Sequence, residues 1–182
     1  MYGLINNALQ GMIREKFGEE QWEKVFEASG VPADSFLTMR SYDDKITYDL
    51  AFAASDVLGA PVATCLEMFG EYWVLETASK SYGPLMDAAG GDIVEFLENL
   101  NALHDRITST FLNYRPPEFQ IKKLPSGTFD IHYHSEREGF VPFVVGLLKG
   151  LAQRFGNSME ILKVTEEDVP QGVHAIFEIS VK

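Results

Sequence analysis

Residues 129–155, FDIHYHSEREGFVPFVVGLLKGLAQRF, change from one periodicity to another and thereby indicate the fold class. Phe129, Ile131 and Tyr133 alternate with polar residues, which is typical of a half-buried strand. From residue 140 to residue 155 the apolar side chains instead repeat with helical spacing. The segment therefore predicts a strand followed by a long apolar helix.

Further strands are expected on both sides of this segment. Phe119 and Ile121 alternate with polar residues, and the turn residues 125–127, Pro-Ser-Gly, predict a hairpin with the strand that begins at Phe129. Residues 161–164 and 175–181 have the pattern of two more strands. The C-terminal part is therefore expected to be an antiparallel sheet with one packed helix.

The chain before Pro117 is expected to be helical. Apolar residues recur at three- and four-residue spacing in five segments: residues 4–17, 22–29, 46–57, 62–73 and 96–111. Pro61 is expected at the first position of the fourth helix, and Pro116-Pro117 must end the fifth. The predicted fold class is α+β, as one domain of residues 1–182 with lobes of about 1–60 and 61–182.

Composition excludes several classes of function. The 182 residues carry 15 Lys and Arg against 27 Asp and Glu, a net charge of −12, which argues against binding nucleic acid or an anionic membrane. The single cysteine, Cys65, excludes a disulfide framework and a multi-thiolate zinc site. The longest nearly apolar run, residues 140–148, is too short to span a bilayer, and no targeting segment is recognisable. A cytoplasmic location is therefore expected.

His104 is the first residue that could carry chemistry. It lies at helical spacing from Leu100, Leu103 and Ile107, so its imidazole is expected on the buried stripe of a helix. One interpretation is a core histidine that is hydrogen-bonded to a carbonyl. The other is an axial ligand, because a neutral imidazole in an apolar wall suits the proximal side of ferrous haem.

Tyr133, Ser135 and Arg137 form the second candidate set. If the strand continues, these three side chains share a face with Phe129 and Ile131, because side chains alternate along a strand. A phenol, a hydroxyl and a guanidinium at the edge of an apolar surface suit a carboxylate or a phosphate. The alternative is a strand end that meets solvent, with the arginine paired to a surface acid.

Other polar residues are interpreted as structural. His132 and His134 share the outer strand face with Asp130; a surface metal is possible there, but a solvated face is the simpler interpretation. His174 is expected to have no companion ligands in the last strand, and Cys65 to be an inert, buried small side chain. Acidic pairs such as Asp43-Asp44 are expected to be solvated caps and turns.

Taken together, His104, the Pro-Pro pair at 116–117 and Tyr133-x-Ser135-x-Arg137 ahead of a glycine and an apolar helix resemble the haem-nitric oxide/oxygen-binding (H-NOX) family. The same fold forms the sensory domain of soluble guanylate cyclases. The resemblance covers essentially the whole chain; residues 133–139, YHSEREG, are close to the guanylate cyclase version, and residues 69–73, FGEYW, resemble cyanobacterial members.

This resemblance implies haem b (Fe protoporphyrin IX) between the helical lobe and the sheet. His104 would be the proximal iron ligand, and Pro117 would press on the porphyrin and distort it. Tyr133, Ser135 and Arg137 would hold the propionates. The residues implied to line the haem pocket are Ile5, Trp73, Phe143 and Leu147.

The resemblance implies a gas sensor and not an enzyme. Family members that hold O2 stably carry a distal tyrosine where this chain has Phe143, so NO and CO are the expected ligands. NO would weaken the iron–His104 bond and release strain at Pro117. The alternatives are an O2 sensor that uses the Trp73 N–H as distal donor, or a passive haem carrier. A haem peroxidase is disfavoured because Ile5, Phe143 and Trp73 offer no acid–base group.

The chain ends at Lys182, soon after the last expected strand, so the output is expected on a separate polypeptide. For bacterial relatives, that partner is a histidine kinase or a diguanylate cyclase/phosphodiesterase.

Overall fold

A computed structural model describes residues 1–32, 36–109, 115–167 and 169–182. Its sheet consists of four antiparallel strands in the order β1-β2-β4-β3. These are β1 (Glu118–Lys123), β2 (Phe129–Ser135), β3 (Met159–Glu167) and β4 (Val173–Val181). The predicted hairpin is β1–β2, which places Phe119 opposite Tyr133 and Ile121 opposite Ile131.

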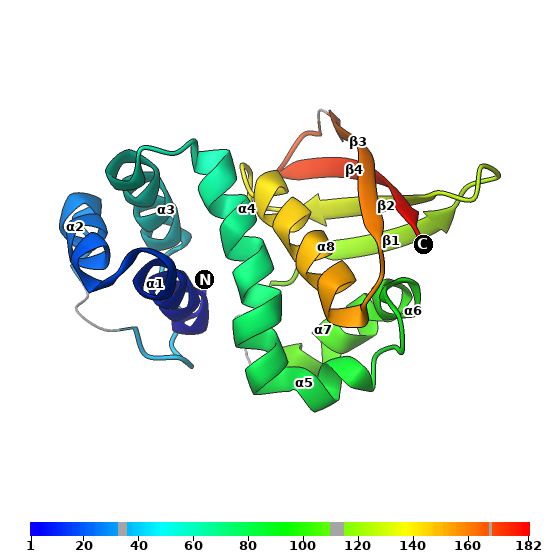
Figure 1. The fold of residues 1–182 in the computed structure, drawn as a ribbon, viewed down its shortest axis with the longest axis horizontal. Coiled ribbons are helices and arrows are strands. Elements are labelled where there is room, and N and C mark those ends of the chain that lie inside the picture. Colours follow the sequence, from blue (N-terminus) through cyan, green and yellow to red (C-terminus); the bar gives the residue numbers. More distant parts are fainter. Residues whose placement is uncertain (33–35, 110–114, 168) are drawn as a thin grey trace.

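Helices make up the chain before the sheet and cover one of its faces. The three N-terminal helices, α1 (Gly3–Phe17), α2 (Glu19–Ser29) and α3 (Asp44–Leu58), lie on one side of α4 (Val62–Tyr72), as Figure 1 shows. The sheet and α8 (Val141–Phe155) lie on the other side of α4. Gly30 and Gly59 adopt left-handed conformations just after α2 and α3, which ends each helix where the sequence predicts.

Three helical details differ from the sequence-based expectation: the position of Pro61, the end of the fourth predicted helix and a break in the fifth. Pro61 is the N-cap of α4, with φ −54° and ψ 139°, instead of its first helical residue. The helical run does not stop near residue 73 but continues through a π-helical segment, η1 (Trp73–Ala78), into α5 (Ser79–Asp87).

The helix expected over 96–111 is divided at Asn99 into α6 (Ile93–Glu98) and α7 (Leu100–Thr108). The Asn99 side chain donates to the carbonyls of Ala89 and Glu95 and so competes with the helical backbone pattern. Asp92 caps α6 by accepting from two backbone amides, those of Val94 and Glu95. Phe111 lies outside the described residues.

Two large apolar clusters, with a small third one of Ala51, Leu66 and Phe140, form the interior. One joins the inner face of the sheet to α6, α7 and α8, and the other joins α1, α2 and α3. Phe69 of α4 belongs to the N-terminal cluster, whereas Trp73 packs against both clusters. The division into lobes of residues 1–60 and 61–182 stays a prediction.

Helices α4 and α8 cross at very short range through glycines. A Cβ atom on Gly70 would lie 2.1 Å from the carbonyl oxygen of Phe143, and one on Gly146 would lie 2.0 Å from that of Glu67. Only residues without a side chain allow this approach, so the two glycines determine how α4 and α8 are placed.

Within the described residues, no single helix is long and apolar enough to cross a membrane. The helical segments 44–58 and 62–87 together have the length and apolar composition of a membrane span, but the chain bends by 114° between them.

Candidate functional site

His104 lies on α7, one turn after the buried Leu100 and beside the buried Leu103. Burial lowers the pKa of this imidazole to about 4, although a hydrogen bond to the Pro117 backbone and the nearby Asp105 oppose the shift. Because proline offers only a carbonyl, the imidazole donates in this hydrogen bond. His104 is therefore neutral at pH 7 and adjacent to Pro117.

Aromatic side chains connect His104 to the sheet. Its ring centroid lies 6.2 Å from that of Phe119, and Phe119 lies 5.3 Å from Tyr133. Phe119 on β1 and Tyr133 on β2 are both buried, because the register of the hairpin directs this pair toward the core. The helix that carries His104 and the strand that carries Tyr133 thus border one apolar region.

Tyr133 and Ser135 share the inner face of β2, as the sequence predicts. Burial raises the pKa of the Tyr133 phenol, and a hydrogen bond with Ser135 and the charge of Arg137 partly offset this effect. Tyr133 is 3% exposed, whereas Ser135 is only partly buried at the end of the strand. The pair therefore presents hydroxyl groups where the apolar interior meets the polar rim.

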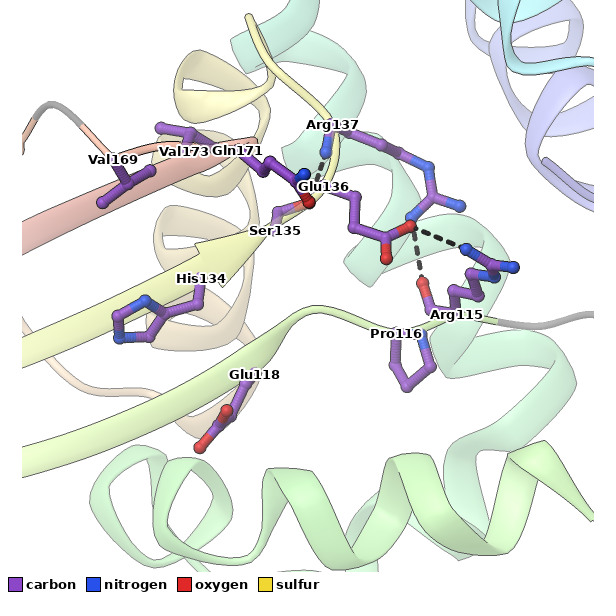
Figure 2. A pocket seen from close by; sticks show the side chains of 10 residues that line it. All are labelled: Arg115, Pro116, Glu118, His134, Ser135, Glu136, Arg137, Val169, Gln171 and Val173. Atoms are coloured by element: carbon purple, nitrogen blue, oxygen red, sulfur yellow. Dashed lines mark hydrogen bonds and ion pairs between the residues drawn. The ribbon is translucent and has the colours of Figure 1, made fainter.

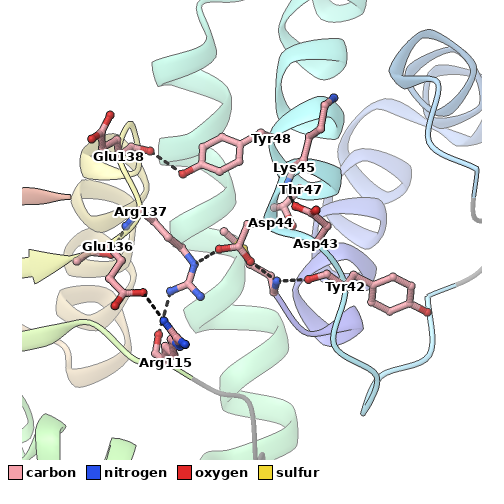
Figure 3. A network of polar contacts seen from close by, with 12 residues as sticks. Tyr42, Asp43, Asp44, Lys45, Thr47, Tyr48, Arg115, Glu136, Arg137 and Glu138 are labelled. Carbon is pink, nitrogen blue, oxygen red and sulfur yellow. Dashed lines mark hydrogen bonds and ion pairs between the residues drawn. The ribbon is translucent and has the colours of Figure 1, made fainter. Parts of the chain in front are cut away.

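Arg137 does not lie on this strand face, because β2 ends at Ser135. The prediction that all three side chains share one face is therefore wrong for Arg137. Its backbone N–H donates to Ser135 Oγ at 3.1 Å, its Nε to Asp44 Oδ2 at 2.8 Å and its Nη1 to the carbonyl of Arg115 at 2.9 Å. The guanidinium thus turns toward the N-terminal helices (Figure 3).

Asp44, at the start of α3, is the acidic partner in this network. It accepts from Arg137 and from the N-terminal ammonium of Met1, which also donates to the carbonyl of Tyr42 at 2.6 Å. Burial alone raises the pKa of Asp44, but the ammonium and Arg137 outweigh it and hold the pKa below its usual value. Its assignment as a solvated cap is wrong; Asp43, its neighbour, is the cap, accepting from the Lys45 amide.

A second link lies beside this ion pair. The hydroxyl of Tyr48 on α3 donates to the carbonyl of Glu138 at 2.8 Å, just after Arg137 (Figure 3). The sequence reasoning missed Asp44 and Tyr48, because each is about 90 residues from its partner and neither has a local signal.

A cavity of about 470 Å³ opens on the other side of Arg137 (Figure 2). Polar residues make up most of its wall, and Arg115 within it is paired with Glu136 at 3.1 Å. The remaining lining residues are Pro116, Glu118, His134, Ser135, Gln171, Val169 and Val173. Ser135 and Arg137 therefore line this cavity together with the apolar Pro116, Val169 and Val173.

The residues expected to line a distal pocket lie on three different helical segments. Trp73 begins η1, Phe143 and Leu147 lie one turn apart on α8, and Ile5 lies on α1. All four side chains are partly buried. The ring centroid of Phe143 lies 4.9 Å from that of Phe69. Ile5, Trp73 and Phe143 pack against the N-terminal cluster, whereas Leu147 packs against the cluster on the sheet, which Trp73 also contacts.

The sequence-based interpretation of His174 is wrong. This residue does have companions: its Nε2 lies 3.1 Å from His132 Nδ1, its Nδ1 lies 2.9 Å from Glu167 Oε2, and its ring stacks on His134 with a centroid distance of 4.0 Å. His132 and His134 are partly exposed, as a solvated face requires. Cys65 is buried as expected, and burial raises the pKa of its thiol.

Chemically, the inner site combines a neutral imidazole with a carboxylate-binding arginine. A neutral imidazole can coordinate a metal ion, and Arg137 already binds the carboxylate of Asp44. The buried rings of Phe119 and Tyr133 connect His104 to β2, ahead of Arg137. This donor set fits a flat apolar cofactor that carries a metal and carboxylates.

Sequence comparison places the chain among known proteins. It matches the family described as Haem-NO-binding over residues 2–163. Soluble guanylate cyclase gcy-31 of Caenorhabditis elegans is 27% identical over 166 residues, which are 91% of this chain and 24% of that protein. Soluble guanylate cyclase 89Db of Drosophila melanogaster is 26% identical over 155 residues, 85% of this chain and 23% of that protein. The chain spans about a quarter of the length of these relatives.

Solved structures share the fold. An H-NOX protein from S. oneidensis in the Fe(II)NO ligation state aligns with a TM-score of 0.84 and 19% identity, over 100% of this chain and 99% of that one. The unliganded Fe(II) H-NOX protein from K. algicida aligns with a TM-score of 0.84 and 20% identity, over 100% and 97%. These alignments confirm the predicted α+β class and its order of elements.

Proposed function

Since the chain belongs to the haem-NO-binding (H-NOX) family and forms a haem-binding sensor domain, we propose that it senses nitric oxide, and carbon monoxide, with His104 as the iron ligand. The family and the assignment as a sensor domain, and not an enzyme, agree with the prediction from sequence. The observation that carries the proposal is the partly buried, neutral His104 next to Pro117 on an apolar region.

Haem iron would supply a coordination site for a diatomic gas, and the chain would supply the ligand and the surroundings. A pKa of about 4 keeps the His104 imidazole neutral and able to coordinate at physiological pH. The hydrogen bond between His104 and the Pro117 backbone holds the two residues together. Their proximity supports Pro117 as the residue that presses on the porphyrin.

Tyr133, Ser135 and Arg137 are proposed to hold the propionates. Arg137 already binds one carboxylate, that of Asp44, and a guanidinium can donate to more than one oxygen. The Tyr133 and Ser135 hydroxyls lie at the border of the interior. Haem b is proposed because the single cysteine, Cys65, provides no Cys-x-x-Cys-His motif for covalent attachment.

The distal residues favour NO and CO over O2. Phe143, Leu147 and Ile5 have no hydrogen-bond donor, and bound O2 gains more from a donor than NO does. Trp73 is the one donor among these four side chains, and an O2 sensor that depends on it is the second candidate function. The partly buried position of Trp73 between the two apolar clusters supports keeping this candidate.

Signalling is proposed to follow a shift of the N-terminal helices against the sheet. The links between these parts include Arg137–Asp44 and Tyr48–Glu138, close to the proposed propionate site. A bound ligand shifts the equilibrium between two arrangements of the N-terminal helices and the sheet only if it binds one arrangement more tightly than the other. The partner is proposed to be a histidine kinase or a diguanylate cyclase/phosphodiesterase in the cytoplasm.

The test compares haem loading of the wild type, His104→Ala and the matched control His132→Ala, which removes an imidazole from the outer sheet face. We expect one haem per chain in the wild type and the control, and none in His104→Ala unless imidazole is added. Normal loading of His104→Ala would refute the ligand assignment. Rapid loss of haem from the wild type to an acceptor protein would favour a passive carrier.

The ligand preference is tested on the reduced, haem-loaded protein by absorption spectroscopy. NO and CO should each change the Soret band, whereas exposure to air should cause no change that reverses on degassing. A reversible change in air that Trp73→Phe abolishes would establish the O2-sensor alternative.

A further inference from the structure

We propose that the outer face of the sheet binds a divalent transition-metal ion through His132, His134 and His174, with Glu167 orienting His174. This proposal is independent of haem. It rests on the position of the three imidazoles and on their distances.

The strand register brings the imidazoles together. His132 and His134 are two residues apart on β2, so both point away from the core side occupied by Ile131 and Tyr133. His174 on β4 is paired directly with His134, and opposite residues of adjacent strands share a face. All three side chains therefore converge on the outer face, across two neighbouring strands.

The distances are those of a site close to coordination. His132 Nδ1 and His174 Nε2 are 3.1 Å apart, and one nitrogen from each of the three rings lies within 4.8 Å of the others. Zinc–nitrogen bonds of about 2.0–2.1 Å in a tetrahedral site separate ligand nitrogens by roughly 3.3 Å. The His132 and His134 rings are nearly parallel to that of His174, with interplanar angles of 20° and 13°, so binding one ion requires the imidazoles to rotate until their nitrogens reach this separation.

Glu167 supplies the outer contact that metal-bound histidines commonly have. Its Oε2 lies 2.9 Å from His174 Nδ1, so the Nε2 of the same ring is directed toward the other two imidazoles. A carboxylate on the far ring nitrogen determines the tautomer and the orientation of a metal-binding histidine. Glu167 pairs with His174 across β3 and β4, which makes this contact part of the sheet register.

The electrostatic surroundings favour a cation. Glu118 faces His134 from β1 in the register, and the two residues lie at the edge of the cavity in Figure 2. With Glu167, carboxylates flank the cluster on both sides.

Three imidazoles and a position open to water are a ligand set suited to zinc and to other late divalent ions. Such an ion would join β2 to β4 and, through Glu167, to β3. It would lie on the face of β2 opposite Tyr133, and therefore apart from the proposed haem site.

The experiment uses the haem-loaded protein, stripped with a chelator and then dialysed against Zn²⁺ at pH 7.5. Bound zinc and iron are counted separately by mass spectrometry of the elements. We expect one zinc per chain, a loss of at least tenfold in affinity for His174→Asn, and a loss of about 10–100-fold for Glu167→Gln. The matched control is Asp130→Asn, on the same strand face two residues before His132, and it should bind zinc like the wild type.

Two results would overturn the proposal. One is a wild type that binds no more zinc than the triple variant in which all three histidines are asparagine. The other is an equal loss of zinc in Asp130→Asn and His174→Asn, which would mean diffuse binding to surface charge. Circular dichroism and iron content establish that each variant is folded and haem-loaded, so a negative result counts against the site itself.

Discussion

The close crossing of α4 and α8 predicts a specific cost for adding one methyl group. In Gly146→Ala the new Cβ would lie 2.0 Å from the carbonyl oxygen of Glu67 and 2.9 Å from the backbone nitrogen of Glu71. An ordinary contact is at least 3.4 Å, so the two backbones must separate by about 1.4 Å. No side-chain rotation can relieve this clash, since the atoms that it meets belong to the helix backbone.

The expected change in the free energy of unfolding for Gly146→Ala follows from two opposing effects. Overpacking of a core costs about 1–3 kcal/mol, and the backbone clash puts this site at the upper end. Alanine regains about 1 kcal/mol over glycine in a helix, which leaves a net loss of about 2 kcal/mol. For a chain of this size, that loss lowers the melting temperature by about 4–8 °C.

Thermal and urea unfolding of the haem-loaded protein measure this change. The matched control is Gly83→Ala in α5, where the nearest atom to a new Cβ is the Arg154 guanidinium at 4.0 Å. This control should be neutral or stabilised by up to about 1 kcal/mol. A Gly146→Ala melting temperature within 1 °C of the wild type, or an equal loss in Gly83→Ala, would refute the packing argument.

Three further predictions concern charge and the distal pocket. Asp44 has a lowered pKa, so its pairing with Arg137 stabilises the fold above the unfolded pKa of about 4 and is lost as pH falls through the lower folded value. Asp44→Asn should therefore cost up to about 1 kcal/mol in urea unfolding at pH 7 and progressively less as the pH falls below about 4, whereas Asp43→Asn, which keeps a capping side chain, should be neutral; equal losses would contradict the ion pair. In the haem-free protein, His104 has a folded pKa of about 4, below its unfolded value of about 6.5, so the unfolded state takes up the proton first. Stability should rise with pH between these values, by up to about 3 kcal/mol, and His104→Gln should flatten that rise; an unchanged pH profile would be the contrary result. Phe143→Tyr places a hydroxyl donor in the distal pocket and should produce a reversible spectral change in air, which Phe143→Leu should not; a silent Phe143→Tyr spectrum would argue against Phe143 as a distal residue.

Much of the fold was predictable because its signals are local. The period-two pattern of residues 129–133 and the helical repeat after residue 140 identify β2 and α8, and Pro-Ser-Gly at 125–127 identifies the hairpin turn. The break at Asn99 was not predictable from periodicity, since it depends on where the side-chain amide finds the Ala89 and Glu95 carbonyls. The π-helical continuation after Trp73 likewise has no period of its own in the sequence.

The functional site also has features that the sequence predicts and features that depend on the tertiary structure. The residues that make this chain resemble its family, His104 and the Tyr133-x-Ser135-x-Arg137 motif, are visible as types at fixed spacing. The direction of the Arg137 side chain is not, because it depends on the end of β2 at Ser135 and on Asp44, which is 93 residues away.

The sequence by itself determined the α+β class, the ends of α2 and α3 and the hairpin, because each depends on residues close to one another in the chain. It also determined the family, through residue types at fixed spacing. Only the tertiary structure decided the glycine contact between α4 and α8, the Arg137–Asp44 pair and the three-histidine cluster. His174 lies 42 residues from its partner His132, and nothing between them indicates that β4 pairs with β2. Strand order is a property of packing over the whole chain, and it brings together side chains that appear isolated in the sequence.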